Sequence, residues 1–148
     1  MIVSASRPPH IPEEDPIHLL DEEAFKREIC KYNGIPDEII NHKEFLDFFL
    51  PMLRADFKMD ETWYTKELVK LSCSITALGG IYDQEADQED INGWKEYTDR
   101  EFNCFMYEGG HFFIKDREVE VIKTIKELIE GTIRERRGQD QTTDFYTG

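Results

Sequence analysis

The chain has 148 residues, a length that suits one domain, and 39% of them are hydrophobic, which is enough to form a core. It carries 18 Lys and Arg against 32 Asp and Glu, and the formal net charge of −14 argues against nucleic acid or an anionic membrane surface as a partner. No apolar run approaches the roughly 20 residues that a membrane span needs. The opening stretch, MIVSASRPPHIP, lacks the basic leader and long apolar segment of a signal peptide. We therefore expect a cytoplasmic protein that binds neither nucleic acid nor membranes.

The first half of the chain predicts one strand followed by helices. Residues 1–6, MIVSAS, form a β-branched apolar run that indicates a buried strand ending at a proline-rich loop. A helix is predicted from Asp21, which has acids in the turn that follows it, to a stop at Gly34. After Pro36, apolar residues recur at three- and four-residue spacings, and Pro51 is expected to bend this helix or to start a new one. The segment thus predicts two or three helices with no strand between them.

The second half of the chain alternates between strand and helix patterns. Residues 71–80, LSCSITALGG, predict a strand, and Asp87 begins a short helix with an acidic first turn. Residues 101–108 predict another strand, and Asp116 begins a helix with one apolar stripe. Residues 134–148 are expected to form a polar tail without regular structure. Strand, helix, strand, helix predicts parallel pairing of the strands.

Neither the cysteines nor the glycines of the chain indicate a cofactor. Cys30, Cys73 and Cys104 are odd in number and far apart, so we expect reduced thiols with a structural role. Together with the four histidines, the cysteines show no zinc-ligand spacing. The two pairs of adjacent glycines also lack the spacing of a nucleotide-binding loop. We therefore predict that the protein has no metal and no cofactor of its own.

An acid and a base are predicted at one edge of the sheet. The element order, with helices inserted after the first strand, is typical of the end of a doubly wound α/β domain, where chemistry gathers beyond the carboxyl ends of the strands. Asp83 follows one glycine pair and His111 follows the other. Acid before histidine is the chain order of the α/β-hydrolase triad. There, a carboxylate orients the imidazole, which removes a proton from a serine hydroxyl.

Each of these features also has an ordinary structural explanation. Asp83 lies in an acidic run and is also compatible with a solvated loop carboxylate, and a histidine after two glycines is more often a turn residue than a catalyst. Asp83, Glu85 and Asp87 alternate like calcium ligands, but Gln88 and Trp94 stand where such a loop needs glycine and glutamate. The apolar stripe before the second strand is either ordinary core or a helical cap over a binding cleft.

Several stretches of the chain resemble a known family. They are SASRPPHIP, LPMLRADFKMDETWY, ITALGGIYDQEADQEDINGWKEYT and FMYEGGHFFI, and they cover most of residues 1–114. Together they resemble the type II, or external editing, thioesterases of nonribosomal peptide and polyketide synthesis, which belong to the α/β-hydrolase superfamily. LPMLRADF is the more specific stretch, since it looks like the lid signature of these enzymes.

The resemblance implies an activity and a set of residues for it. The implied reaction is hydrolysis of acyl thioesters on the phosphopantetheine arm of acyl or peptidyl carrier proteins, which removes aberrant acyl groups. By the resemblance, Asp83 matches the triad acid and His111 the base, and the helices from about 21 to 64 match the lid. Four lid residues would then lie near the acyl or pantetheine path: Leu50, Leu53, Arg54 and Phe57.

The sequence departs from the family at the nucleophile. No G-x-S-x-G segment is present, and the four serines, Ser4, Ser6, Ser72 and Ser74, lie in or at the ends of predicted strands without flanking glycines. We therefore expect residues 1–133 to be the C-terminal part of an α/β-hydrolase fold, with about three parallel strands and a helical lid, inactive by itself. Two alternatives are a non-catalytic module that binds a carrier protein or an acyl chain, and a half-enzyme complemented by a separate N-terminal chain. An uncovered edge on the first strand would favour self-association.

Overall fold

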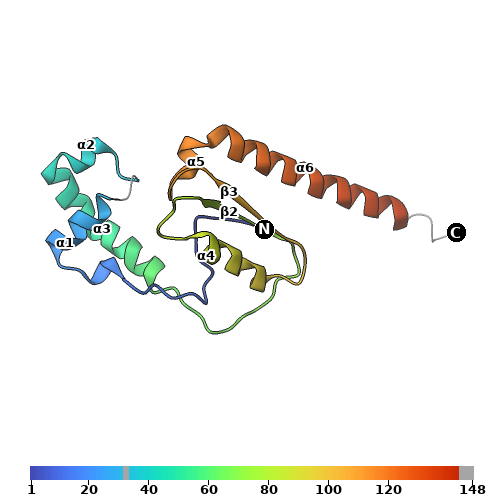
Figure 1. The fold of residues 1–148 in the computed structure, drawn as a ribbon, viewed down its shortest axis with the longest axis horizontal. Helices are drawn as coiled ribbons and strands as arrows, with labels where there is room; N and C mark the ends of the chain where they lie inside the picture. The colour runs from blue at the N-terminus through green and yellow to red at the C-terminus, as the bar shows by residue number, and fades with distance from the viewer. Residues whose placement is uncertain (32–33, 144–148) are drawn as a thin grey trace. The chain divides into compact units, whose positions relative to one another are not determined.

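The computed structural model describes residues 1–31 and 34–143. The chain divides into two compact units, Met1–Phe112 and Phe113–Gly148, and each is described by itself. The first unit contains a small sheet, one helix packed on it and a group of helices inserted between its first two strands (Figure 1). The described residues of the second unit include two helices.

The sheet is made of three parallel strands in the order β1-β2-β3. They are β1 (Ile2–Ser4), β2 (Ile75–Gly80) and β3 (Phe102–Tyr107). All of β2 is buried, as expected for a central strand that reads as a continuous apolar run. The predicted parallel α/β arrangement is confirmed. The first strand was expected to be buried, and this is wrong at its start, because β1 lies at the sheet edge and Ile2 is 41% exposed.

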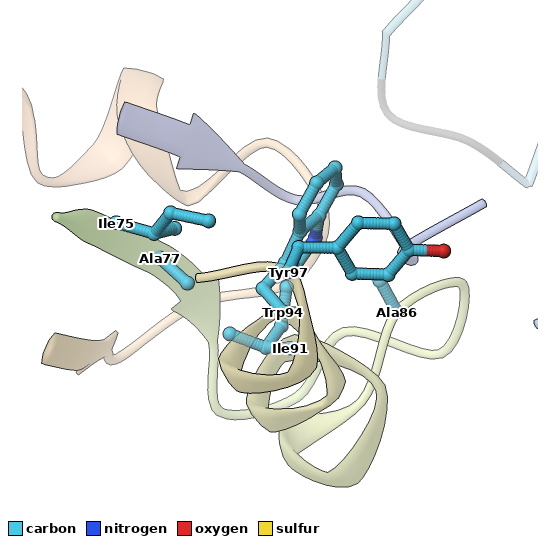
Figure 2. Packing of buried hydrophobic residues seen from close by; sticks show 6 residues of the cluster. All are labelled: Ile75, Ala77, Ala86, Ile91, Trp94 and Tyr97. Atoms are coloured by element: carbon cyan, nitrogen blue, oxygen red, sulfur yellow. The ribbon is translucent and has the colours of Figure 1, made fainter. Parts of the chain in front are cut away.

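The helix predicted from Asp87 is also confirmed. The Asp87 carboxylate accepts hydrogen bonds from the first turn of α4 (Gln88–Gly93), and Asp90 completes a capping box. A 3₁₀ helix, η2 (Trp94–Tyr97), follows directly. These elements pack on β2 and form the first of two cores, made of Ile75, Ala77, Ala86, Ile91, Trp94 and Tyr97 (Figure 2).

The predicted lid, from about residue 21 to 64, contains α1 (Glu22–Ile29), α2 (Asp37–Ile40) and α3 (Lys43–Glu61), and η1 (Ile17–Leu19) directly precedes it. Its own core contains Phe25, Ile29, Leu46 and Leu50. No new helix begins at Pro51, so that alternative is wrong: α3 is continuous through it. Proline inside a helix costs about 3 kcal/mol. Here the residues on both sides of Pro51 pack into the same core, which offsets this cost.

The second unit holds α5 (Phe113–Asp116) and α6 (Glu118–Thr143). The expectation of an unstructured tail is wrong for residues 134–143, which continue α6, while residues 144–148 lie outside the described part. An ion pair between residues four apart, Arg134 with Glu130 at 3.3 Å, supports the helix at this point. Among the described helices, none has the length and apolar character needed to cross a membrane.

The cysteines are free thiols. Cys30 and Cys104 are half-buried, which fits the predicted structural role, and burial raises the pKa of the Cys104 thiol. Cys73 is exposed, which does not fit the structural role predicted for it.

Candidate active site

Backbone contacts join the loops that follow β2 and β3. The last residue of β2, Gly80, approaches the second loop so closely that a Cβ on it would lie 2.4 Å from the Gly110 oxygen and 2.7 Å from the Gly109 oxygen. Gly109 has a φ of 138°, which side-chain-bearing residues rarely adopt. Its oxygen accepts a hydrogen bond of 2.9 Å from the Tyr82 nitrogen. Only glycine fits at this contact, and the contact fixes the two loops relative to each other.

The joined loops bring Asp83 and His111 into contact. His111 Nδ1 lies 3.2 Å from Oδ1 and 3.1 Å from Oδ2 of Asp83. The Asp83 side chain is fully buried, and its Oδ1 also accepts a hydrogen bond of 2.9 Å from the Glu85 nitrogen. With Asp83 ionised, Nδ1 of His111 is the donor, so the neutral imidazole keeps its lone pair on Nε2.

The surroundings of His111 stabilise its protonated form. The hydrogen bond to Asp83 raises the pKa of His111, against the opposing effect of burial, and the charges of Asp83, Glu85 and Asp60 act in the same direction as the bond. The side chain remains 32% exposed. In the described part of the chain, no hydrogen-bond partner is found for Nε2. The arrangement is that of an oriented base with one ring nitrogen available.

His111 lies at a cavity of about 390 Å³. One wall is the loop after β1, which starts at Ala5 with an unusual φ of 47°. This loop is held in place because Trp94 Nε1 donates a hydrogen bond of 2.7 Å to the Ser6 oxygen. The apolar part of the lining comes from this loop, the lid and the residue after His111, and includes Ile11, Ile29, Ile35, Leu53, Phe57 and Phe112.

The four lid residues predicted near a substrate path separate into two pairs. Leu53 and Phe57 line the cavity. Leu50 is only 6% exposed in the core of the lid and is not part of the cavity lining. Arg54 also lies outside the lining, and its guanidinium stacks 4.1 Å from the centre of the Phe25 ring. The structure therefore brings only the first pair together with His111.

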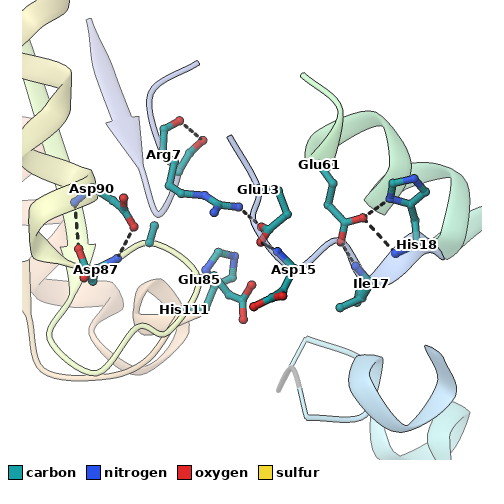
Figure 3. Close-up of polar contacts among 12 residues, drawn as sticks. Arg7, Glu13, Asp15, Ile17, His18, Glu61, Glu85, Asp87, Asp90 and His111 are labelled. Carbon is teal, nitrogen blue, oxygen red and sulfur yellow. Dashed lines mark hydrogen bonds and ion pairs between the residues drawn. The ribbon is translucent and has the colours of Figure 1, made fainter. Parts of the chain in front are cut away.

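Arg54 and Glu61, which both lie on α3, hold the short helix η1 at its two ends. Glu61 accepts hydrogen bonds from the backbone nitrogens of Ile17 at 2.9 Å and His18 at 3.0 Å, and a third from His18 Nδ1 (Figure 3). Arg54 Nη1 donates to the oxygens of His18 at 2.5 Å and Leu20 at 2.7 Å. An acid at the start of a helical turn and a cation at its end match the helix dipole. We refer to Arg54, Glu61 and η1 together as the clasp.

The predicted site residues did not include five charged residues of the described cavity wall: Arg7, Glu13, Asp60, Glu61 and Glu85. Glu61 lines the cavity as well as holding η1. Arg7 and Glu13 form an ion pair across the proline-rich loop (Figure 3). Arg7 lay within a stretch that carried the family resemblance, which was the available signal for it. Glu61 lay within another such stretch, LPMLRADFKMDETWY, but nothing in the periodicity of α3 distinguishes it from its acidic neighbours.

The serines of the chain are not in hydrogen-bond contact with His111 among the described residues. Ser6 lines the cavity, but its hydroxyl bonds the Arg7 oxygen at 3.3 Å. Ser4 has a buried hydroxyl without a partner, and Ser72 and Ser74 are exposed. Among the described residues, the acid–base pair is therefore present without a serine in hydrogen-bond contact.

Comparison with known proteins identifies relatives of most of the chain. The family model described as the thioesterase domain matches residues 1–129. The gramicidin S biosynthesis protein GrsT of Aneurinibacillus migulanus is 36% identical over 124 residues, or 83% of this chain and 48% of GrsT. Thioesterase PikA5 of Streptomyces venezuelae is 32% identical over 127 residues, or 86% of this chain and 45% of PikA5.

A solved thioesterase structure is also similar to this chain in sequence and fold. The thioesterase RedJ, from the prodiginine biosynthetic pathway of Streptomyces coelicolor, is 30% identical, has a TM-score of 0.73 and is matched over 83% of this chain and 50% of its own. The predicted fold class, part of an α/β-hydrolase with a helical lid, is thereby confirmed. The chain spans about half the length of the curated relatives that it matches.

Proposed function

We propose that this chain, which belongs to the type II thioesterases of nonribosomal peptide and polyketide pathways, provides the acid–base pair and the acyl cavity for hydrolysis of thioesters on phosphopantetheinyl carrier proteins. One observation carries the proposal: Asp83 holds the Nδ1 side of His111, and the imidazole lies at a cavity with apolar walls. An apolar cavity of this kind suits an acyl chain.

The chemistry assigned to His111 has two proton transfers in each half-reaction. Nε2 removes the proton of a serine hydroxyl as its oxygen bonds to the thioester carbonyl carbon, and the imidazolium then protonates the departing pantetheine sulfur. In the second half, Nε2 removes a proton from water, which attacks the acyl-enzyme, and returns it to the serine oxygen. Asp83 stabilises the imidazolium formed each time.

The proposal assigns the nucleophile to a G-x-S-x-G segment outside this sequence, because no such segment is present in it. The test is a chimaera in which the N-terminal part of GrsT, up to the region matched here, precedes this chain. We expect the chimaera to hydrolyse the thioesters of carrier proteins loaded with acetyl or aminoacyl groups, measured as the appearance of the free pantetheine thiol. His111→Ala and Asp83→Asn should each lower the rate by at least about 1,000-fold.

The matched control is Asp99→Asn, which changes an exposed acid that is not among the described residues of the cavity lining. It should leave the rate unchanged. A chimaera that is folded by circular dichroism but hydrolyses at the same rate with and without His111 would overturn the proposed role of the histidine.

A non-catalytic binding module is the second candidate, and the absence of a serine in contact with His111 favours it. In that case the chain alone would bind an acyl-pantetheine analogue in which a stable amide replaces the thioester. The folded chimaera would show no turnover of thioesters.

A further inference from the structure

One aromatic ring, that of Phe112, contacts both the proposed base and the lid. Phe112 directly follows His111 in the chain. The two rings pack edge to face, with their centres 5.1 Å apart and an angle of 88° between their planes. Aromatic pairs prefer this arrangement, so the contact restrains both rings. Both residues line the cavity.

The contact with the lid is made at Gly34. This residue lies between α1 and α2, and a Cβ placed on it would be 2.4 Å from Cζ and 2.7 Å from Cε2 of the Phe112 ring. Carbon atoms in ordinary contact are about 3.5–4.0 Å apart. An alanine at position 34 would therefore displace the ring or lift this part of the lid. Gly34 also lines the cavity.

The contact with Asp83 alone does not fix the direction of the imidazole. Both carboxylate oxygens bind one atom of the ring, Nδ1, at 3.2 and 3.1 Å. A hydrogen bond loses little strength over a bend of roughly 30°, so the ring can tilt while Nδ1 stays bonded, and such a tilt moves Nε2. A second ring packed against the imidazole resists the tilt. The direction of Nε2 therefore depends on where the Phe112 ring lies.

We propose that Phe112 is a positioning residue for His111, and that Gly34 of the lid holds the Phe112 ring where it can act in this way. The inference rests on the proposed function, in which Nε2 has to point at the serine hydroxyl. It adds a connection from the lid to the base, because the lid contacts Phe112 and Phe112 contacts the imidazole. A lid in this position orients the base, whereas a displaced lid leaves the imidazole less restrained.

The first test is a double-mutant cycle on the full 148-residue chain, with the NMR signals of the His111 imidazole protons as the readout. Gly34→Ala places a methyl group against the ring and should shift these signals, although residue 34 belongs to the lid. Phe112→Leu removes the ring and should shift them as well. In the Phe112→Leu background, Gly34→Ala should cause no further shift, because the ring atoms that the methyl group would meet are gone.

Two further variants make this readout specific. His111→Gln identifies the signals, since the other three histidines remain. Gly131→Ala is the matched control, because no atom of the described residues lies within 4 Å of its Cβ position, and it should leave the His111 signals unchanged. If Gly34→Ala shifts the signals equally with and without the Phe112 ring, or does not shift them at all, the inference is wrong.

The second test separates a positioning role from a role as cavity wall. In the chimaera, a misdirected base slows the chemical step, so Phe112→Leu and Gly34→Ala should each lower kcat about tenfold while KM stays within about twofold. The double variant should be no slower than Phe112→Leu alone. A raised KM with an unchanged kcat would make both residues parts of the cavity wall only, and would overturn the inference.

The two tests also separate this inference from the proposed function. A folded chimaera without thioester hydrolysis would refute the proposed function, while the NMR cycle on the chain alone still decides whether Gly34 acts on His111 through Phe112. A chimaera that needs His111 but keeps its kcat in both variants would retain the proposed function and overturn the positioning role. Non-additive shifts of the His111 signals together with a lowered kcat support the inference.

Discussion

The acid–base pair and the wall of the cavity opposite it are positioned in different ways. The loops that carry Asp83 and His111 are joined by backbone, with Gly80 directly against the oxygens of Gly109 and Gly110. The wall formed by η1 and the lid is held by the long side chains of the clasp. A close backbone contact cannot shift to accommodate one added methyl group. Side-chain contacts can rearrange, so a substitution there removes only part of the stabilisation. The two regions should therefore respond differently to small substitutions.

Gly80→Ala should have the largest effect. The new methyl group would overlap the two carbonyl oxygens, which cannot rotate away like a side chain. We expect a loss of about 3 kcal/mol in the free energy of unfolding, measured in urea, together with loss of the Asp83–His111 contact. Gly131→Ala is the control, because nothing lies within 4 Å of its Cβ position and alanine favours a helix. It should stabilise by about 1 kcal/mol. Equal stability of both variants would refute the backbone argument.

Asp83→Asn tests the electrostatic part of the same region. Because Asp83 raises the pKa of His111, we expect the pKa to fall in the variant, measured by NMR titration of the imidazole protons.

The linked stability follows from the sign of that shift. A histidine whose pKa is raised on folding contributes stability that is fully present below its unfolded value of about 6.5 and is lost as the pH rises through the folded value. Wild-type stability should fall over this range, and the fall should be smaller in Asp83→Asn. An unchanged pKa of His111 in the variant would mean that Asp83 is not the main cause of the raised value.

Arg54→Met tests the clasp with a side chain of similar length. It removes two hydrogen bonds to backbone oxygens and the stacking on Phe25, and we expect a loss of about 1–2 kcal/mol. Lys58→Met removes an exposed cation from the same helix and should stay within about 0.5 kcal/mol of wild type. If the two variants lose the same stability, the clasp is not what holds this wall.

Ala5→Gly should have the smallest effect and the opposite sign. Ala5 has a φ of 47°, a conformation that costs a residue with a Cβ about 1–2 kcal/mol. Glycine relieves this strain but loses more chain entropy, so we expect a gain of about 0.5–1 kcal/mol in urea unfolding. The same change in a helix, Ala55→Gly, should instead cost about 1 kcal/mol. A loss of stability in Ala5→Gly would contradict the assigned strain.

The same comparison explains what could be predicted from the sequence. Asp83 and His111 could be identified together, because glycine pairs and strand patterns determine where parallel strands end, and those ends meet at one edge. The functions of the lid residues could not be separated, because Leu50, Leu53 and Phe57 share one apolar stripe and only the tertiary packing determines which of them meets the cavity. The contacts of Arg54 and Glu61 depend on where η1 and the residue after it lie, and their partners there are 34 to 44 residues away in the sequence.

The clasp has a consequence for motion. Since α3 holds both ends of η1, and the Thr65 nitrogen donates a hydrogen bond of 2.9 Å to the Pro9 oxygen, the end of the lid is attached to the proline-rich wall. That wall is in turn attached to the sheet region, because Trp94 Nε1 donates to the Ser6 oxygen and His10 Nδ1 lies 3.3 Å from the Tyr97 hydroxyl. The chain is next attached to the sheet region at Leu71, whose nitrogen donates to the Tyr97 oxygen at 2.8 Å. Residues 66–70 lie between these attachments and contain no helix or strand. Widening of the cavity would therefore move the lid against a proline-rich wall that stays attached to the sheet region, while the clasp itself stays closed.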